Sequence, residues 1–344
     1  MLSDLPDVLR DALPNGVLSA DPEEVVQAWQ SLASPRALWS LVSEALGVHG
    51  QRYVRLLLQL IGVLVLRAVY ACFSGAVRSG TLSRGVQLVC KTVLFCFLVG
   101  QAMTVLEGVV AFYQDLQALT GAYLPLMGTM YALGGNVATA LTNQSTLMLA
   151  FLLVQWVGGK TVVPLFCLCL AFSMLGAFES GVAGRMQTLT GRLKKWYTTA
   201  LGLVMLLLSG ALTVQTVLAA RADSLGFRAA RFAISNSIPF VGGGVGDMLR
   251  TAASGISWMR GVIGVGGIIL LLWLLLPQIV SLLLARWVLS VAEDVAGWLG
   301  CNEEGRLIGE IGGLSGYLLA VVSLSVMTFF FALVMLFKCG AAFG

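Results

Sequence analysis

Histidine and charged residues are scarce in this 344-residue chain. His49 is the only histidine, and 11% of the residues are charged against 58% that are hydrophobic. A single histidine argues against a multi-histidine metal site, a Ser-His-Asp triad and a histidine proton relay. The low charge content and a mean hydropathy of +0.89 place the chain outside the range of soluble domains. Its solvent is therefore expected to be a lipid bilayer.

The remaining polar residues give no sign of chemistry. The seven cysteines show no CxxC spacing and five lie inside apolar runs, which favours free, buried thiols. The net charge of +4 comes from short basic clusters between apolar runs, a pattern that suits membrane orientation better than nucleic-acid binding. The first 12 residues lack the basic and apolar regions of a signal peptide. We expect no enzyme activity, no cofactor, no metal, no nucleic acid and no cleavable signal.

Apolar windows of about 20 residues, the length that crosses a bilayer, recur along the chain. The fold class is therefore an all-α polytopic integral membrane protein with about eight transmembrane helices. The spans are expected at about 53–73, 86–106, 123–140, 145–157, 161–178, 197–219, 261–284 and 315–337. The third segment is rich in glycine and contains Pro125, which predicts a broken or re-entrant element. Gly158, Gly159 and Lys160 predict a tight hairpin between the fourth and fifth spans.

Outside these spans the sequence predicts helices that lie on a surface. Asp21, Pro22 and two glutamates mark the start of a short helix over 22–33. Interfacial amphipathic helices are expected over about 35–46 and 181–196, with another within 286–310. We divide the chain into a polar, helical N-terminal region, 1–52, which is expected to be extracytoplasmic, and a multi-spanning membrane domain, 53–344.

The charge distribution predicts an orientation. Basic residues dominate 74–85 and 184–196, which places both on the cytoplasmic side. That arrangement requires an extracytoplasmic N-terminus and three crossings between Asp115 and Arg185. The segment 221–260 would then lie outside although it carries five arginines.

The most distinctive segment is 228–247, RAARFAISNSIPFVGGGVGD, where polar residues, a proline and glycines interrupt hydrophobic surroundings. A smooth helix is not expected through it, and irregular backbone at membrane depth is stable only in protein or beside water. It is our candidate for a pore-lining, gating or packing element, while an ordinary exposed loop stays an alternative. The candidate residues are Arg228, Arg231, Asn236, Pro239, Gly242, Gly243, Gly244, Gly246 and Asp247.

Two glycine patterns are more specific. The run that begins at Gly242 lacks the Lys-Ser/Thr and the preceding strand of a phosphate loop, so nucleotide binding is not expected. Gly242 with Gly246, and Gly312 with Gly316, have the spacing that lets helices approach closely, within or between chains.

The stretch 212–255, LTVQTVLAARADSLGFRAARFAISNSIPFVGGGVGDMLRTAASG, resembles the corresponding part of the stage III sporulation protein AE family. The similarity continues through GVIGVGGIILLLWLLLP at 261–277 and RWVLSVAEDVAGWLG at 286–300, and covers most of 38–338. Where the family has Thr-Gly-Asn-Phe-Ile-Pro, this chain keeps Asn236 and Pro239 but not the glycine and the aromatic residue.

The resemblance implies a non-enzymatic, multi-pass subunit of the channel between mother cell and forespore, in the outer forespore membrane, needed for endospore development after engulfment. It also implies partners: the other products of the sporulation stage III A operon, including an ATPase and ring-forming proteins, and a forespore membrane protein. Homo-oligomer formation stays open. The alternative function is an autonomous secondary transporter or permease, which would need repeats and a midplane polar site that the sequence does not show.

Overall fold

Long helices make up the described chain. The computed structural model describes residues 22–74, 80–133, 148–149, 151–178, 183–237 and 242–341, and for 222–263 the backbone alone. The elements are α2 (Pro22–Ala33), α3 (Pro35–Ser74), α4 (Gly80–Leu133), the π-helical segment η3 (Trp156–Lys160), α6 (Val162–Phe178), α7 (Ala183–Ser237), α8 (Gly242–Trp298) and α9 (Asn302–Ala341). No strand occurs within these ranges, which confirms the all-α class.

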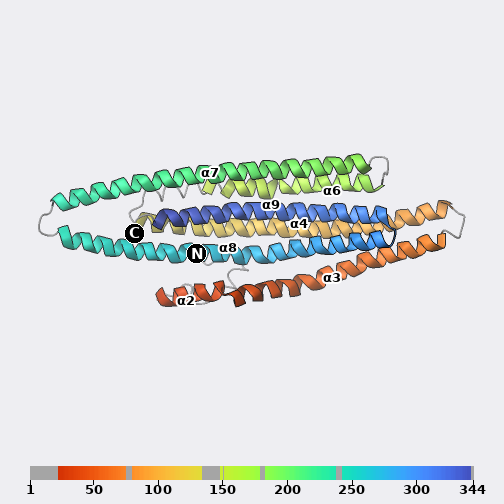
Figure 1. Cartoon of the computed structure of the whole chain (residues 1–344), viewed down its shortest axis with the longest axis horizontal. Coiled ribbons are helices and arrows are strands. Elements are labelled where there is room, and N and C mark those ends of the chain that lie inside the picture. The colour runs from red at the N-terminus through yellow and green to blue at the C-terminus, as the bar shows by residue number, and fades with distance from the viewer. Residues whose placement is uncertain are drawn as a thin grey trace.

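The long helices run side by side in an elongated bundle (Figure 1). Helix α9 is central, because it packs against α8, α7, α4 and α6, while α8 also contacts α3 and α4. Side chains of α9 such as Val321 and Val322 are completely buried, and the rings of Phe151 and Phe329 stack with centroids 3.8 Å apart. The predicted helix over 22–33 is confirmed as α2, which lies on α8 with Trp29 against Gly266.

Six helical segments are long and apolar enough to cross a membrane, counted over the described residues. They are Pro35–Phe73, Leu88–Thr129, Phe151–Ser173, Thr188–Gln215, Gly264–Trp298 and Asn302–Val334. Large apolar side chains are exposed on the bundle surface, among them Leu58, Leu206 and Met327. Such a surface is stable in lipid and would be costly in water. The protein is therefore a polytopic helical membrane protein, and the predicted count of eight spans is not confirmed.

Two predicted interruptions account for the difference between eight and six. The first part of the third predicted span, as far as Leu133, continues α4 through Pro125 in the same direction. The rest of that span, 134–140, lies outside the described residues, so the re-entrant element is not confirmed. The predicted hairpin at Gly158 is wrong, because the chain stays helical from 151 through η3 and into α6.

The physical reason for this continuous helix is the packing of Tyr113 from α4. The Tyr113 ring fills the space beside Gly158, and a Cβ on that glycine would lie 2.6 Å from Tyr113 Cζ. The Tyr113 hydroxyl also bonds to Ser325 Oγ of α9 at 2.7 Å. The two glycines thus open one turn of helix for an aromatic ring, and the wider π-helical turn accommodates it. Glycine here serves close packing and does not end the helix.

The predicted amphipathic helices after residue 34 are present as parts of longer helices. Residues 35–46 begin α3, residues 183–196 begin α7, and 286–298 end α8. Their exposed indoles are those of Trp39, Trp196, Trp287 and Trp298. A separate interfacial helix was therefore the wrong description of these segments, since each is continuous with a candidate span.

The helix ends next to the two basic segments 74–85 and 184–196 lie together. The end of α3, the start of α4 and the start of α7 lie at one end of the bundle, and the end of α7 and the start of α8 lie at the other (Figure 1). Over the residues that the structure describes, the three crossings expected between Asp115 and Arg185 reduce to one, Phe151–Ser173. Because the number of crossings changes by two, the two basic segments still lie on the same side of the membrane as each other. The assignment of that side to the cytoplasm stays a prediction.

A cysteine at Gly191 tests the orientation. Position 191 is exposed in α7 and a Cβ there meets nothing within 4 Å. In a background without the native cysteines, we expect Gly191→Cys to resist a membrane-impermeant thiol reagent in intact cells and to react after permeabilisation. Ready labelling of intact cells would invert the orientation.

Candidate functional site

The tight turn between α8 and α9 is the best-defined polar feature of the described bundle. Its residue Gly300 has a φ of +74°, a left-handed conformation that favours glycine. The Cys301 amide donates to the Ala296 carbonyl at 2.9 Å, and the Gly300 amide donates to Gly297 at 3.1 Å. This pattern satisfies the last carbonyls of α8 as a Schellman motif does. The turn therefore holds the start of α9 in a fixed place.

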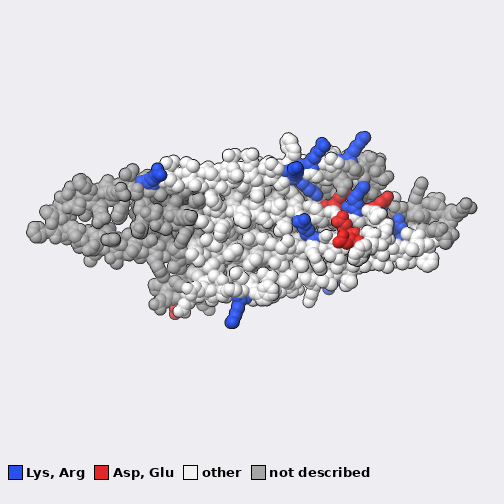
Figure 2. All heavy atoms as spheres, viewed as in Figure 1, with Lys and Arg blue, Asp and Glu red and all other residues white. Residues whose placement is uncertain are grey.

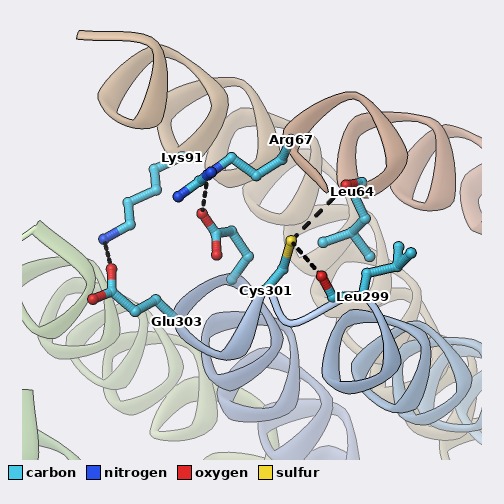
Figure 3. Close-up of polar contacts among 7 residues, drawn as sticks. Leu64, Arg67, Lys91, Leu299, Cys301 and Glu303 are labelled. Atoms are coloured by element: carbon cyan, nitrogen blue, oxygen red, sulfur yellow. Dashed lines mark hydrogen bonds and ion pairs between the residues drawn. The ribbon is translucent and has the colours of Figure 1, made fainter. Parts of the chain in front are cut away.

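Two ion pairs join the start of α9 to the α3–α4 hairpin (Figure 3). Arg67 Nε of α3 lies 3.2 Å from Glu304 Oε1, and the Glu304 side chain is 4% exposed. Lys91 of α4 pairs with Glu303, which is more than half exposed. A buried carboxylate is costly without a partner, so Arg67 is essential to the placement of Glu304. The Lys91 pair is accessible to solvent and contributes less.

Cys301 fills the space between these ion pairs and α3. Its thiol faces the Leu64 and Leu299 carbonyl oxygens, each 3.9 Å from Sγ (Figure 3). Burial and the Glu304 carboxylate both raise the pKa of the Cys301 thiol, against the opposing charge of Arg67. A thiol kept protonated is a poor nucleophile. We therefore read Cys301 as a packing residue. The group formed by Arg67, Lys91, Cys301, Glu303 and Glu304 is called the turn cluster below.

Further polar contacts extend from the turn cluster along α9. Glu310 accepts a hydrogen bond from Ser173 of α6 and lies 3.9 Å from Arg306 Nε. Charged side chains gather at this end of the bundle, next to a band without charge (Figure 2). No group of three His, Cys, Asp or Glu residues within the described ranges could hold a metal ion. The contacts are suited to fasten helices together.

Glycines of α9 bring α8 close, as the Gly312/Gly316 spacing predicted. A Cβ on Gly312 would lie 3.4 Å from Leu289 Cβ, and one on Gly316 would lie 3.5 Å from the Arg286 guanidinium. A Cβ on Gly305 would lie 3.1 Å from Ala296 Cβ, near the turn. The close-packing prediction is confirmed within the chain at Gly312, whereas the neighbour of Gly316 is the end of a long arginine side chain. The pair Gly242 and Gly246 lies where the backbone alone is described.

The residues predicted as the functional element lie at the other end of the bundle. Arg228, Arg231 and Asn236 belong to the last turns of α7, and Pro239 lies outside the described residues. The first two turns of α8 contain Gly242, Gly243, Gly244, Gly246 and Asp247. Helices α7 and α8 approach this end together and project beyond α9 (Figure 1). Smooth helix through the whole segment was not expected, and α7 ends at Ser237 before α8 begins at Gly242.

The length of these two helices exceeds the thickness of a bilayer. Helix α7 has 55 residues and α8 has 57. At about 1.5 Å per residue each is roughly 80 Å long, against a hydrocarbon core of about 30 Å. Seven charged residues occur over 221–260, and such residues are rare in lipid-facing helix. We call the two arms, 221–237 and 242–260, the distal hairpin.

Sequence reasoning did not find the turn cluster. Arg67 and Lys91 lie within apolar runs near the loop between the first two predicted spans, and in the structure each pairs with a glutamate of α9. One signal was available: a basic residue within an apolar helix calls for an acidic partner elsewhere in the bundle. The pattern does not indicate which acid, because Arg67 and Glu304 are 237 residues apart.

These features define a class: a polytopic helical membrane protein with its helices fastened by ion pairs at one end. The model of the stage III sporulation protein AE family matches residues 27–340, so the chain belongs to this family of sporulation proteins. The stage III sporulation protein AE of Bacillus subtilis (strain 168) is 21% identical over 290 residues, which are 82% of this chain and 71% of that protein. No solved structure matches the chain.

Proposed function

We propose that this protein is a non-enzymatic membrane subunit of a channel complex that joins mother cell and forespore during endospore development. The observation that carries the proposal is the family match over 27–340, nearly the whole bundle. The six apolar helices support a multi-pass subunit, which we place in the mother-cell-derived outer forespore membrane. Its partners are the other products of the stage III A operon, with an ATPase and ring-forming proteins among them, and a forespore membrane protein.

The distal hairpin is the part of the chain that we assign to contact with the rest of the complex. If the basic end faces the mother-cell cytoplasm, the distal hairpin extends into the intermembrane space, where the ring-forming proteins would lie. Its arginines over 221–260 are then in water or against a partner, where they are stable. Glycines at the start of α8 permit a second backbone to approach closely. The function proposed for 228–247 is therefore packing or pore lining at this projection.

Deletion and complementation test the proposal. Without the gene, we expect development to stop after engulfment, and the wild-type gene to restore heat-resistant spores. The double variant Gly243→Leu/Gly244→Leu should insert normally yet reduce spore counts by several orders of magnitude, because leucine side chains block close backbone contact. The matched control is Gly191→Leu, at an exposed position where a Cβ meets nothing within 4 Å. If the deletion strain sporulates normally and the operon products do not co-purify with the protein, the channel-subunit proposal is wrong. The alternative function, an autonomous secondary transporter, would then be favoured.

A further inference from the structure

Two cations converge on an exposed face of α9, at the border between the charged end and the uncharged band. Lys194 Nζ of α7 lies 3.5 Å from the position of a Cβ on Gly313, and the Arg286 guanidinium of α8 lies 3.5 Å from that on Gly316. Residues three apart on a helix are surface neighbours, so the two cationic groups are within roughly 12 Å of each other. The missing glycine side chains leave the space that these long side chains occupy.

Neither cation forms an ion pair with a carboxylate that the structure describes. The acidic neighbour of Lys194 is Glu310, whose carboxylate is engaged by Ser173 and Arg306. Glu293 lies against Gly309, one helical turn farther toward the turn cluster. Gly313 and Gly316 follow Gly309 and Glu310 along α9, so the two cations lie on the side of these acids away from the turn cluster. They are available to an anion that approaches from there.

Aromatic side chains indicate that this border is a membrane interface. Trp196 is 80% exposed and Trp287 is 62% exposed, and each lies within two residues of one of the cations. Tryptophan is enriched at the headgroup level of bilayers, where its ring is in contact with lipid and its N–H with water. At about 1.5 Å per residue, each indole lies at nearly the same level along its helix as the neighbouring cation, which fits that position. Phosphate groups of lipids lie at the same depth.

Below the cations, α9 presents an exposed strip toward the uncharged band. Gly313, Ala320 and Met327, each seven residues from the next, share one exposed face of the helix. Helices α7 and α8 flank α9, since Gly202 of α7 lies beside Leu324 and Leu289 of α8 lies beside Gly312. Figure 1 shows α9 between the two helices. Small and apolar residues at the first positions of the strip leave room for an acyl chain.

We propose that this face binds an anionic phospholipid, with Lys194 and Arg286 on its headgroup phosphate and an acyl chain along Gly313, Ala320 and Met327. Basic side chains between transmembrane helices recognise anionic headgroups in this way. The occupant is a lipid and not a free phosphate, because the cations border an apolar strip and exposed indoles. The site does not depend on the proposed channel function.

Lipid binding to the full-length protein in detergent tests the site. Phosphatidylglycerol, phosphatidylcholine and inorganic phosphate are titrated separately and followed by native mass spectrometry. We expect phosphatidylglycerol to bind about 10-fold more tightly than phosphatidylcholine, and the double variant Lys194→Gln/Arg286→Gln to remove that preference. Lys195→Gln is the control, since Lys195 is exposed on α7 and adjacent residues of a helix do not share a face with each other, and it should keep affinity within about twofold.

A second variant tests the acyl-chain strip without a change of charge. Ala320 is exposed, so Ala320→Trp should fold, and its ring should lower phosphatidylglycerol affinity several-fold by covering the strip. An unchanged lipid preference in the double variant overturns the proposal. A second outcome also overturns it: inorganic phosphate binds as tightly as phosphatidylglycerol, and Ala320→Trp has no effect on binding. The ligand of the two cations would then be a free anion and not a lipid.

Discussion

Replacement of Arg67 by methionine is expected to lower the free energy of unfolding by about 3 kcal/mol. The Glu304 side chain is 4% exposed, and its carboxylate would lose the guanidinium that lies 3.2 Å away. Loss of one partner leaves an uncompensated buried charge, which costs about 3–5 kcal/mol in proteins. Methionine keeps the approximate length and the apolar stem of arginine, so the packing of α3 against α9 changes little. Unfolding titrations in mixed detergent micelles measure the difference.

The reciprocal substitution separates charge burial from contact loss. Glu304→Gln leaves Arg67, whose side chain is 18% exposed and can turn toward water. Its cost should therefore be smaller, about 1 kcal/mol, as for a neutral hydrogen bond. The double variant Arg67→Met/Glu304→Gln should be more stable than Arg67→Met alone. Arg306→Gln, which removes a 46% exposed partner of Glu310, should change stability by less than about 1 kcal/mol. Equal costs for Arg67→Met and Arg306→Gln would contradict a structural role for the turn cluster.

The fold class could be predicted because apolar run length is a strong signal that does not depend on tertiary context. The start of α2 after Asp21 was equally readable, since capping chemistry is local. Helix ends within the bundle could not be predicted in this way. Gly158 and Gly159 have low helix propensity, yet the structure keeps them helical because the ring of Tyr113 occupies the space beside them. Tyr113 lies about 45 residues earlier in the chain, outside any local window.

Long-range pairing limited the prediction of the site in the same way. A surface helix was predicted within 286–310, the segment between the last two predicted spans, which also contains Glu303, Glu304 and Glu310. In the structure, Glu304 and Glu310 are largely buried and contact α3 and α6, respectively. The pattern alone cannot distinguish a solvated acid from one that fastens two helices. A cation inside an apolar run, as at Arg67, is the observation that should prompt a search for such an acid.

Free cysteines were predicted, and the six that the structure describes are free. Their burial was predicted less well, since Cys72, Cys96 and Cys167 are exposed on the bundle. The error has a physical origin: an apolar run in a membrane helix faces lipid on one side and protein on the other. Hydropathy does not distinguish those two environments, because both are apolar.

Gly158→Ala is expected to lower the free energy of unfolding by about 2–3 kcal/mol. The added Cβ would lie 2.6 Å from Tyr113 Cζ, and Tyr113 is 4% exposed, so the ring has nowhere to move. Insertion of a methyl group into a filled core costs about 1–3 kcal/mol. Displacement of the ring would also lengthen the Tyr113–Ser325 hydrogen bond, which contributes about 1 kcal/mol. The matched control, Gly191→Ala, should stabilise α7 by about 0.5–1 kcal/mol, because helix propensity alone acts at that open position.

A double-mutant cycle distinguishes steric exclusion from a requirement for glycine backbone in η3. Tyr113→Leu removes the ring that meets Gly158 and leaves space there. If the ring is the cause, Gly158→Ala should cost much less in the Tyr113→Leu background, with a coupling energy of about 1 kcal/mol or more. If the π-helical turn itself requires glycine, the two costs should add. An additive result would mean that the backbone of η3, and not the Tyr113 ring, requires glycine at position 158. The same kind of double-mutant cycle can be made for Gly266 with Trp29 and for Gly267 with Tyr123, where an aromatic ring also occupies the space beside a glycine.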